Sequence, residues 1–292
     1  MEKASKDVFI SRKEETGFHE FPASAPNLLL VEDNKVNQYV ALSILKKIDL
    51  DADVAENGVQ ALEMLREKEY DLVLMDIQMP EMDGFEATRN IRDHNSGVLR
   101  SDVPIIAMTA DATKEDREKC FAAGMNDYIP KPVNREHLFT VLQQQLCQER
   151  IKKTQGSQGK IRQEEDRQAE QEHSPDLSLD HLPIFDRADL VERLGGCDEG
   201  IDDFLYELPR YLAADMAELQ TAFKQNDIQG ILASAHKIKG MCANASAKRC
   251  QELAWRIESA AKQDNIDAAQ DLLSHLEQEE KVLRAYLAQK CS

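Results

Sequence analysis

The chain has 292 residues, of which 42% are hydrophobic, and a formal net charge of −18. This length exceeds that of an ordinary single domain and predicts two domains, each with its own packed core. The acidity argues against a nucleic-acid-binding surface, because phosphate backbones select faces rich in Lys and Arg. The sequence has no apolar run of the length that a membrane-spanning helix needs, so we expect no membrane segment in this chain.

Cysteine usage bears on the compartment in which the protein works. The six cysteines form no C-x-x-C pair and no Cys/His cluster with zinc spacing. Scattered thiols without a pairing pattern are typical of reduced cysteines in the cytosol. Residues 1–15 also lack the apolar core of a signal peptide. We therefore expect a cytoplasmic location, and we expect residues 1–26, which are polar and aperiodic, to form a flexible N-terminal tail.

A regular alternation of short apolar runs and amphipathic stretches occupies residues 27–147. Short runs that are apolar throughout fit strands that are buried on both faces. Strands that alternate with helices predict a parallel sheet with helices on both sides, here a doubly wound, five-stranded, flavodoxin-like α/β domain. The expected strands are 28–31, 52–55, 72–75, 105–108 and 128–129, and the expected helices are 35–47, 58–68, 84–93, 113–122 and 134–147.

The composition changes at residues 148–183, which are rich in Gln, Glu, Lys, Gly and Ser and contain no Phe, Tyr, Trp or Val. Such a segment cannot bury enough apolar surface to offset the entropy of ordering it, so we expect a polar linker. A flexible coil of this length spans about 30–35 Å. The linker would therefore let the two domains reach one another.

Helical spacing of the apolar residues continues through residues 184–292, and no strand pattern occurs there. This predicts an all-α antiparallel helix bundle as the second domain. Asp186 is expected to cap the first helix and Gly195-Gly196 to end it. Pro209 is expected to kink or split the next helix. The later helices are expected at 200–225, 227–243, 246–263 and 265–290.

Charged and polar residues follow several expected strands directly. The first strand is followed by Glu32 and Asp33, the third by Asp76, the fourth by Thr109, and the fifth leads to Lys131. Parallel strands place their carboxyl ends at one edge of the sheet, so these side chains should converge. Three carboxylates repel one another unless a cation lies among them, and oxygen ligands suit Mg²⁺. We predict a Mg²⁺-dependent site in which Asp76 accepts a phosphoryl group, with Lys131 and Thr109 contacting its oxygens.

Four motifs extend this prediction to a family. LLLVEDN (28–34), LVLMDIQMPEMDGFEA (72–87), IIAMTA (105–110) and DYIPKPV (127–133) occur in this order. Through them, residues 27–147 resemble the receiver domain of response regulators. The resemblance implies that Mg²⁺ is held by Glu32, Asp33 and Asp76 together with the backbone carbonyl of Gln78.

The same resemblance carries two expectations about conformation. It implies a cis Lys131-Pro132 bond, and it implies that Tyr128 shifts between inactive and active states. A different class, the haloacid-dehalogenase-like phosphatases, also uses an aspartate nucleophile at such an edge. Their D-x-D motif follows the first strand, whereas here Asp76 follows the third strand and Gln78 takes the position of the second aspartate. The receiver interpretation is therefore favoured.

One histidine of the predicted bundle, His236, has neighbours that would suit a phosphoryl group. On a helical wheel His236 lies at the edge of the apolar face. Gly240 follows one turn later on the same side, and because Gly costs roughly 1 kcal/mol relative to Ala in a helix, its presence indicates a need for clearance. Lys237 and Lys239 flank the histidine and could neutralise a phosphoryl group. A surface histidine without a function is the alternative on histidine statistics alone. The apolar face is expected to comprise Ile228, Ile231, Ala235, Ile238 and Cys242.

The arrangement His236-Lys239-Gly240 has the form H-x-x-K-G. Through it, residues 184–291 resemble the histidine phosphotransfer domain. The resemblance implies that His236 carries a phosphoryl group and that Lys239 assists it. The motif continues through Asn244, Ala247 and residues 253–258, whereas Met241 and Ser246 depart from the commonest pattern.

Together the two resemblances imply a two-component phosphorelay protein of signal transduction. Asp76 would accept a phosphoryl group and His236 would carry one to or from a receiver. The implied partners are a sensor histidine kinase upstream, separate or fused, and a receiver domain downstream. The sequence has no Gly-rich nucleotide loop, P-loop or kinase catalytic segment, so the chain itself is not expected to be a kinase, although this domain order is usual at the end of hybrid histidine kinases.

A binding module is the alternative function. Phosphorylation of Asp76 would then only switch a face of the first domain between two states, and the bundle would only dock partners. Replacing His236 with Gln separates the two hypotheses, because only the relay loses transfer to a downstream receiver.

Overall fold

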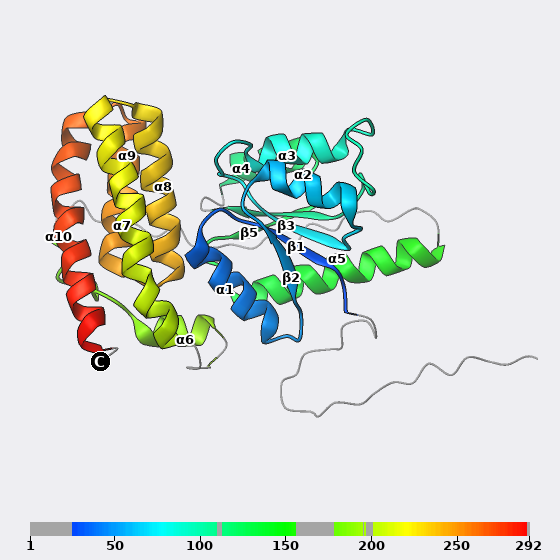
Figure 1. The fold of residues 1–292 in the computed structure, drawn as a ribbon, viewed down its shortest axis with the longest axis horizontal. Coiled ribbons are helices and arrows are strands. Elements are labelled where there is room, and N and C mark those ends of the chain that lie inside the picture. Colours follow the sequence, from blue (N-terminus) through cyan, green and yellow to red (C-terminus); the bar gives the residue numbers. More distant parts are fainter. Residues whose placement is uncertain (1–24, 110–112, 156–177, 195, 197–200, 291–292) are drawn as a thin grey trace, which may run out of the picture.

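The computed structural model describes residues 25–109, 113–155, 178–194, 196 and 201–290, without the side chains of 148–155. Most of the expected tail, much of the expected linker and Ala110 lie outside the described residues. Figure 1 shows a domain built on a sheet beside a bundle of helices. The expected fold classes of the two domains are both confirmed.

The sheet has five parallel strands in the order β2-β1-β3-β4-β5. Strand β1 pairs with both β2 and β3, so that Leu30 lies beside Val54 on one side and Leu74 on the other. This order is that of flavodoxin-like folds, in which the edge at the carboxyl ends of β1 and β3 is the usual functional site. The strands are β1 (Leu28–Val31), β2 (Ala52–Ala55), β3 (Leu72–Asp76), β4 (Ile105–Thr109) and β5 (Asp127–Pro130).

Helices cover both faces of the sheet, because alternate strand residues point to opposite sides. Leu28 and Leu30 pack into one core with α1 and α5, and Leu29 and Val31 pack into another with α2, α3 and α4. In Figure 1 these two layers lie below and above the sheet. The helices are α1 (Lys35–Lys46), α2 (Gly58–Glu67), α3 (Gly84–Arg92), α4 (Lys114–Ala123) and α5 (Arg135–Gln155).

Helix α5 is longer than the sequence pattern indicated. It was expected to end near residue 147 but continues to Gln155. Residues 148–155 contain Gln, Glu, Arg and Lys, which are good helix formers, and contain neither Gly nor Pro. The first part of the expected linker is therefore helical.

The second domain consists of antiparallel helices. Asp186 caps α6 as expected, because its side chain accepts a hydrogen bond from the amide of Asp189. The expected turns at Asn226 and Asp264 are present, and both residues have positive φ angles, of 50° and 58°. The helices are α6 (Arg187–Arg193), α7 (Ile201–Gln225), α8 (Ile228–Asn244), α9 (Lys248–Lys262) and α10 (Ile266–Lys290).

Two details of the bundle differ from expectation. Helix α7 continues through Pro209, so the expected split is absent. Leu208 and Leu212 beside it are fully packed, and this packing holds the helix together where proline removes a backbone hydrogen bond. Ile228 was expected in the core but is 37% exposed, because it is the first residue of α8 and lies at the end of the packed face.

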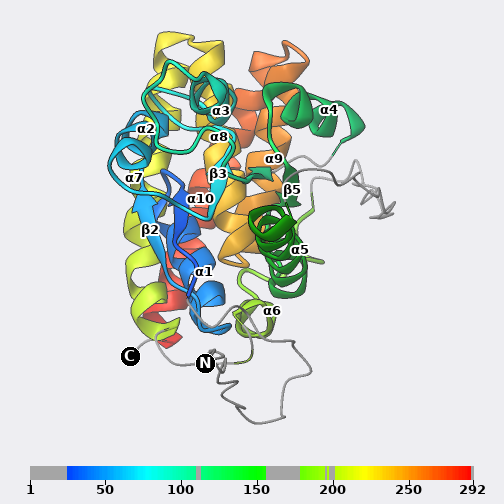
Figure 2. The same cartoon turned by 90° about the vertical axis from the view of Figure 1, so that its right-hand side faces the viewer.

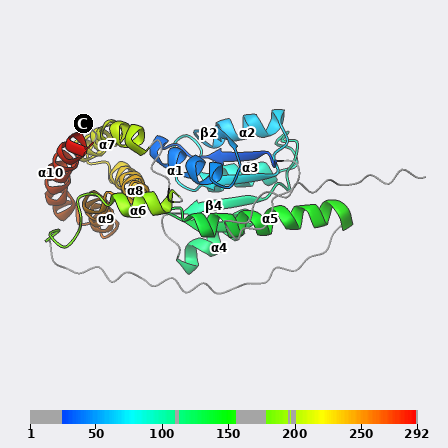
Figure 3. The ribbon, with the colours of Figure 1, turned by 90° about the horizontal axis from the view of Figure 1, so that it is seen from below.

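The bundle packs against the sheet domain on the side where α1 begins. Tyr39 of α1 stacks on Phe204 of α7, with ring centroids 4.6 Å apart. Apolar residues of α1 and of the bundle belong to one continuous core. Figures 1 and 3 show α8 on the side of the bundle next to the sheet domain and α10 on the far side, and Figure 2 shows the sheet domain in front of the bundle. Among the described residues, no helix combines the length and the apolar composition needed to cross a bilayer.

Candidate functional site

The carboxylates predicted at the strand ends lie together. Glu32 and Asp33 follow β1, and Asp76 ends β3, the strand next to it. One oxygen from each carboxylate lies within 4.8 Å of those of the other two. Glu32 and Asp76 are 1% and 6% exposed, and Asp33 is partly exposed. The parallel register of the strands thus gathers three acidic groups in a mostly buried site.

Lys131 is the cation of this site. Its Nζ lies 2.7 Å from Oε2 of Glu32 and 2.8 Å from Oδ2 of Asp76. The Lys131-Pro132 bond that follows is cis, as expected. Burial alone would lower the pKa of Lys131, but the charges of Asp76 and Glu32 outweigh it and raise that pKa above its ordinary value. Lys131 therefore stays charged, and one positive charge faces three carboxylates.

The excess negative charge of this site raises the pKa values of its own carboxyl groups. Burial and the neighbouring charge of Glu32 raise the pKa of Asp33 to about 6. The same two causes raise the pKa of Asp76 above its ordinary value, although Lys131 opposes them. Lys131 alone thus leaves the carboxylates under mutual repulsion, which a divalent cation would relieve. The carboxylates of Glu32, Asp33 and Asp76 fit such a cation, because hard cations prefer oxygen ligands.

Two further predicted residues border Asp76. Thr109 ends β4 and is 7% exposed, and its backbone carbonyl accepts a hydrogen bond from the amide of Lys131. Gln78 is exposed, and its amide donates to Oδ1 of Asp76 at 3.4 Å. Both residues are placed at the same edge as the acids. Their roles toward a phosphoryl group and a metal stay predictions.

Tyr128 lies in β5 and is half-buried against the core on the α2, α3 and α4 side. The guanidinium carbon of Arg117 lies 4.6 Å from the centre of its ring, a cation–π contact. The structure places this aromatic residue on the strand that leads to Lys131. Its movement between two states stays a prediction.

Gly84 shapes the backbone behind Asp76. A Cβ built at this position would lie 2.1 Å from the carbonyl oxygen of Asp76. The Gly84 amide also donates to the carbonyl of Ile77 at 2.8 Å. Only glycine allows this approach, which holds the start of α3 against the end of β3 and so fixes Asp76.

The predicted histidine is oriented by a buried carboxylate. His236 Nδ1 lies 3.0 Å from Oε1 of Glu258, and the His236 side chain is 14% exposed. Burial favours the neutral form of Glu258, but the hydrogen bond with His236 and the charge of Lys239 outweigh it and hold the pKa of Glu258 well below its usual range. An ionised carboxylate only accepts hydrogen bonds, so Nδ1 carries the proton. Nε2 of the neutral ring is then the unprotonated nitrogen.

The lysines near the histidine already have partners. Lys239 Nζ lies 2.8 Å from Oε2 of Glu258, and Lys262 Nζ lies 2.8 Å from Oε1. Lys239 points to a buried acid one helix away, and its expected role in neutralising a phosphoryl group stays a prediction. Glu258 therefore connects the histidine to two cations.

The space expected beside Gly240 is present. A Cβ built at this residue would meet no atom within 4 Å, although the residue itself is buried. Gly240 lies one turn beyond His236 on the same side of α8. Free volume therefore lies beside the helix at that turn.

Lys237 lies between the two domains. Its Nζ is 2.9 Å from Oδ1 of Asp215 and 4.0 Å from Oδ2 of Asp33. Asp215 also accepts a hydrogen bond from the side-chain amide of Asn34, at 3.2 Å. The residue after His236 thus reaches the acidic site of the sheet domain, which places α8 at the edge that carries this site.

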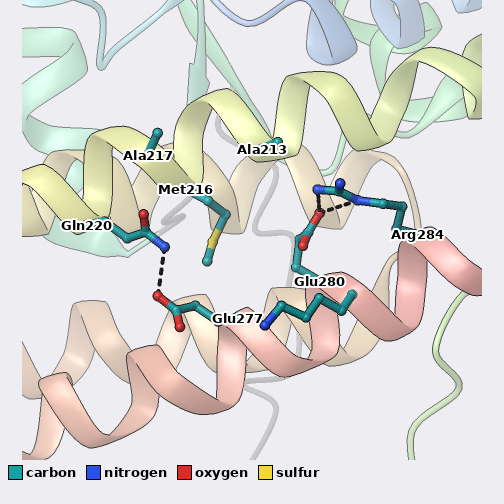
Figure 4. Close-up of a pocket in the computed structure, with 8 residues that line it drawn as sticks. Ala213, Met216, Ala217, Gln220, Glu277, Glu280 and Arg284 are labelled. Atoms are coloured by element: carbon teal, nitrogen blue, oxygen red, sulfur yellow. Dashed lines mark hydrogen bonds and ion pairs between the residues drawn. The ribbon is translucent and has the colours of Figure 1, made fainter.

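A separate pocket of about 190 Å³ lies between α7 and α10. Figure 4 shows that four of its polar side chains form two pairs, Gln220 with Glu277 and Arg284 with Glu280. It contains none of the predicted site residues. We assign it no part in the chemistry.

Sequence reasoning missed several polar residues that complete the site. Asp215 and Asn37 were not singled out, and Glu258 entered only as the end of a motif segment. Glu258 lies 22 residues after His236, on the antiparallel neighbour α9. The H-x-x-K spacing places His236 and Lys239 on one side of α8. Two such groups together favour an acid on the facing helix, but the spacing does not identify which acid.

Comparison with known families gives two matches. The family described as response regulator receiver domain matches residues 28–143, and the family described as Hpt domain matches residues 201–288. Each match contains one of the predicted phosphoryl acceptors.

Curated relatives are histidine kinases. The aerobic respiration control sensor protein ArcB of Escherichia coli (strain K12) is 31% identical over 276 residues, which are 92% of this chain and 33% of ArcB. The probable histidine kinase 1 of Oryza sativa subsp. indica is 39% identical over 166 residues, 46% of this chain and 17% of the relative. The chain thus spans a third or less of the length of these relatives.

Solved structures are also similar to the sheet domain. The receiver domain of a sensor histidine kinase from Pseudomonas aeruginosa PAO1, with a magnesium ion in its active site cleft, is 42% identical. It covers 42% of this chain and 99% of its own, with a TM-score of 0.39. A co-crystal structure of the Saccharomyces cerevisiae phosphotransfer protein Ypd1 with the Ssk1 receiver domain is 33% identical, covering 43% and 91%, with a TM-score of 0.40.

Proposed function

The chain belongs to the two-component phosphorelay proteins, with a receiver domain followed by an Hpt domain, and on this premise we propose that Asp76 and His236 are its two phosphoryl acceptors. One observation carries the proposal. Lys237, next to His236, lies 4.0 Å from Asp33 at the acidic site, so the acceptor helix of the Hpt domain docks on the acceptor edge of the receiver domain. We further propose that phosphoryl transfer runs between these two residues of one chain.

The receiver site supplies an oxygen nucleophile. Glu32, Asp33 and Asp76, with the Gln78 carbonyl, would hold Mg²⁺, which when bound offsets negative charge on the phosphoryl group during transfer. An oxygen of Asp76 attacks phosphorus on the donor phosphohistidine; the O–P bond forms as the N–P bond breaks, and the nitrogen keeps the electron pair. Lys131, 2.8 Å from Asp76, would contact one phosphoryl oxygen and Thr109 another.

The Hpt site supplies a nitrogen nucleophile. With the Nδ1 proton held by Glu258, Nε2 of His236 has a lone pair free for attack on the phosphorus carried by Asp76. The N–P bond forms as the O–P bond breaks, and the carboxylate of Asp76 is restored. In the neutral ring with its proton on Nδ1, Nε2 is unprotonated, so attack by this form needs no base. The developing positive charge on the imidazole is stabilised by Glu258.

The relay needs partners at both ends. A sensor histidine kinase would donate to Asp76, and a receiver domain would accept from His236. Four cysteines of the described residues are free thiols, Cys120, Cys147, Cys242 and Cys250, which supports a cytoplasmic setting for this chemistry.

Labelling with a small-molecule phosphodonor and Mg²⁺ tests the proposal. Aspartyl phosphate is lost in base, whereas phosphohistidine survives base and is lost in acid. Wild type should give both species, His236→Gln only the base-labile one, and Asp76→Asn neither, unless a donor phosphorylates the histidine directly. Passage of label from the His236→Gln variant to a separate downstream receiver would contradict the relay and support the alternative, a switched binding module.

A further inference from the structure

A chain of buried hydrogen bonds connects the Hpt domain to the acidic site. Asn244 Nδ2 donates to Oδ1 of Asn37 at 2.8 Å, and Asn37 Nδ2 donates to Oε1 of Glu32 at 2.8 Å. The three residues are 1%, 6% and 1% exposed respectively. Asn244 also accepts a hydrogen bond from the amide of Val133 at 3.1 Å. Asn244 therefore contacts both the first helix of the receiver domain and the loop that carries Lys131.

The direction of these bonds fixes how Asn37 is oriented. A side-chain amide has one acceptor atom and one donor group. Because Asn244 donates to the oxygen of Asn37, the Asn37 nitrogen must point the other way, to Glu32. If the Hpt domain separates, the oxygen loses this partner and the amide is free to rotate. The docked bundle thus selects the orientation in which Asn37 donates to Glu32.

Glu32 depends on its donors for its own position. Oε1 accepts from Asn37 and, at 3.3 Å, from the amide of Asn34, and Oε2 pairs with Lys131. Among these donors, the Asn37 amide is oriented by a side chain of the other domain, whereas Asn34 donates to Glu32 through its backbone and contacts Asp215 of the bundle through its side chain. A change in docking therefore reaches the orientation of Glu32 most directly through the Asn37 amide.

We propose that Asn37 and Asn244 couple docking of the Hpt domain to binding of the divalent cation. The docked domain holds Glu32 beside Asp33 and Asp76 and so raises the affinity for the cation. By linkage, the bound cation strengthens docking by the same factor. The inference rests on the proposed function, because it takes the three carboxylates as the cation site.

Lys237 lies in the same interface and acts against cation binding. It brings a positive charge to 4.0 Å from Asp33, which by itself would weaken cation binding. Its closer partners are Asp215 at 2.9 Å and Glu218 at 3.3 Å, both within the bundle. These acids balance its charge, so the hydrogen-bond chain decides the sign of the coupling.

Calorimetric titration of the full chain with MgCl₂ tests the coupling. Asn244→Ala and Asn37→Ala should each raise the Kd for Mg²⁺ by about fivefold, the size of a modest coupling between sites. In the double variant the two effects should not add, because both break one chain of bonds. Asn265→Ala is the matched control, since this asparagine only caps α10 of the same bundle, and it should leave the Kd unchanged.

Hydrogen exchange of α1 and α8 gives the reciprocal measurement. Mg²⁺ should slow exchange at this interface in wild type and not in Asn37→Ala, an effect that a merely structural asparagine would not produce. If Asn244→Ala does not fold, Asn244→Ser replaces it. An unchanged Kd in Asn244→Ala, or additive effects in the double variant, overturns the coupling while leaving the proposed function intact. Failure of wild type to bind Mg²⁺ overturns the cation site itself.

Discussion

The two proposed acceptor sites of this molecule have opposite charge. At the receiver edge, the carboxylates of Glu32, Asp33 and Asp76 face one lysine of their own domain, and Lys237 of the bundle approaches Asp33 only to 4.0 Å. In the Hpt bundle, one carboxylate, Glu258, faces two lysines and the imidazole. A phosphoryl group brings negative charge to either site. The difference therefore predicts which site needs an external cation and which supplies its own.

Removal of the metal should produce the largest difference in behaviour between the two sites. Chelation with EDTA is expected to slow phosphorylation of Asp76 by about a hundredfold or more, because a bound cation contributes several kcal/mol to such transition states. Phosphohistidine already formed on His236 should persist, because its surroundings hold cations of their own. Acid and base lability of the label measures both quantities in one sample. Equal sensitivity of the two phosphorylated residues to EDTA would contradict the comparison.

Replacing Glu258 should disrupt the site around His236, which contains its own cations. Glu258→Leu removes the buried carboxylate that partners Lys239, and we expect the free energy of unfolding to fall by about 3 kcal/mol. Glu258→Gln keeps an acceptor for His236 Nδ1 and should cost less. Urea denaturation measures both losses, and Glu277→Gln, on the far helix α10, is the matched control. A loss below about 0.5 kcal/mol in Glu258→Leu would mean that this carboxylate does not hold the site together.

Acid should weaken the same contact in a defined pH range. The pKa of Glu258 is lowered in the folded state, so its charge stabilises the fold above the unfolded pKa of about 4.3. This stabilisation is lost as pH falls through the lower folded value. The difference in unfolding free energy between wild type and Glu258→Gln should therefore be constant from pH 7 to about 5 and shrink below about pH 4. A difference that stays constant down to pH 3 would show that the depressed pKa is wrong.

Weakening the contact between the domains should have a smaller effect, and it should change two transfer rates in opposite directions. Phe204→Ala removes the ring that stacks on Tyr39. We expect transfer from Asp76 to His236 to slow by about tenfold, the equivalent of about 1.4 kcal/mol. Hand-off from His236 to a separate receiver should become faster, because the in-chain receiver covers the same helix. Quenched-flow labelling measures both rates, and slowing of both would indicate damage to the bundle rather than undocking.

Much of this architecture could be predicted from the sequence because the informative signals are local. Leu28–Val31 is apolar throughout and two acids follow it directly, so strand and site follow from adjacent residues. The cap at Asp186 is equally local. By contrast, the pairing of His236 with Glu258 depends on the packing of two helices, and the contact of Asn37 with Asn244 joins residues 207 positions apart. The continuity of α7 through Pro209 depends on packing in the same way.

Dilution tests the central claim, transfer within one chain, most directly. The rate at which label moves from Asp76 to His236 should be measured at protein concentrations from about 0.1 to 10 µM, far below the roughly millimolar effective concentration that tethering provides. We predict one rate constant throughout, because donor and acceptor are docked in the same molecule. A rate that rises in proportion to concentration would show that His236 serves the receiver of another chain and would contradict the docked, in-chain relay.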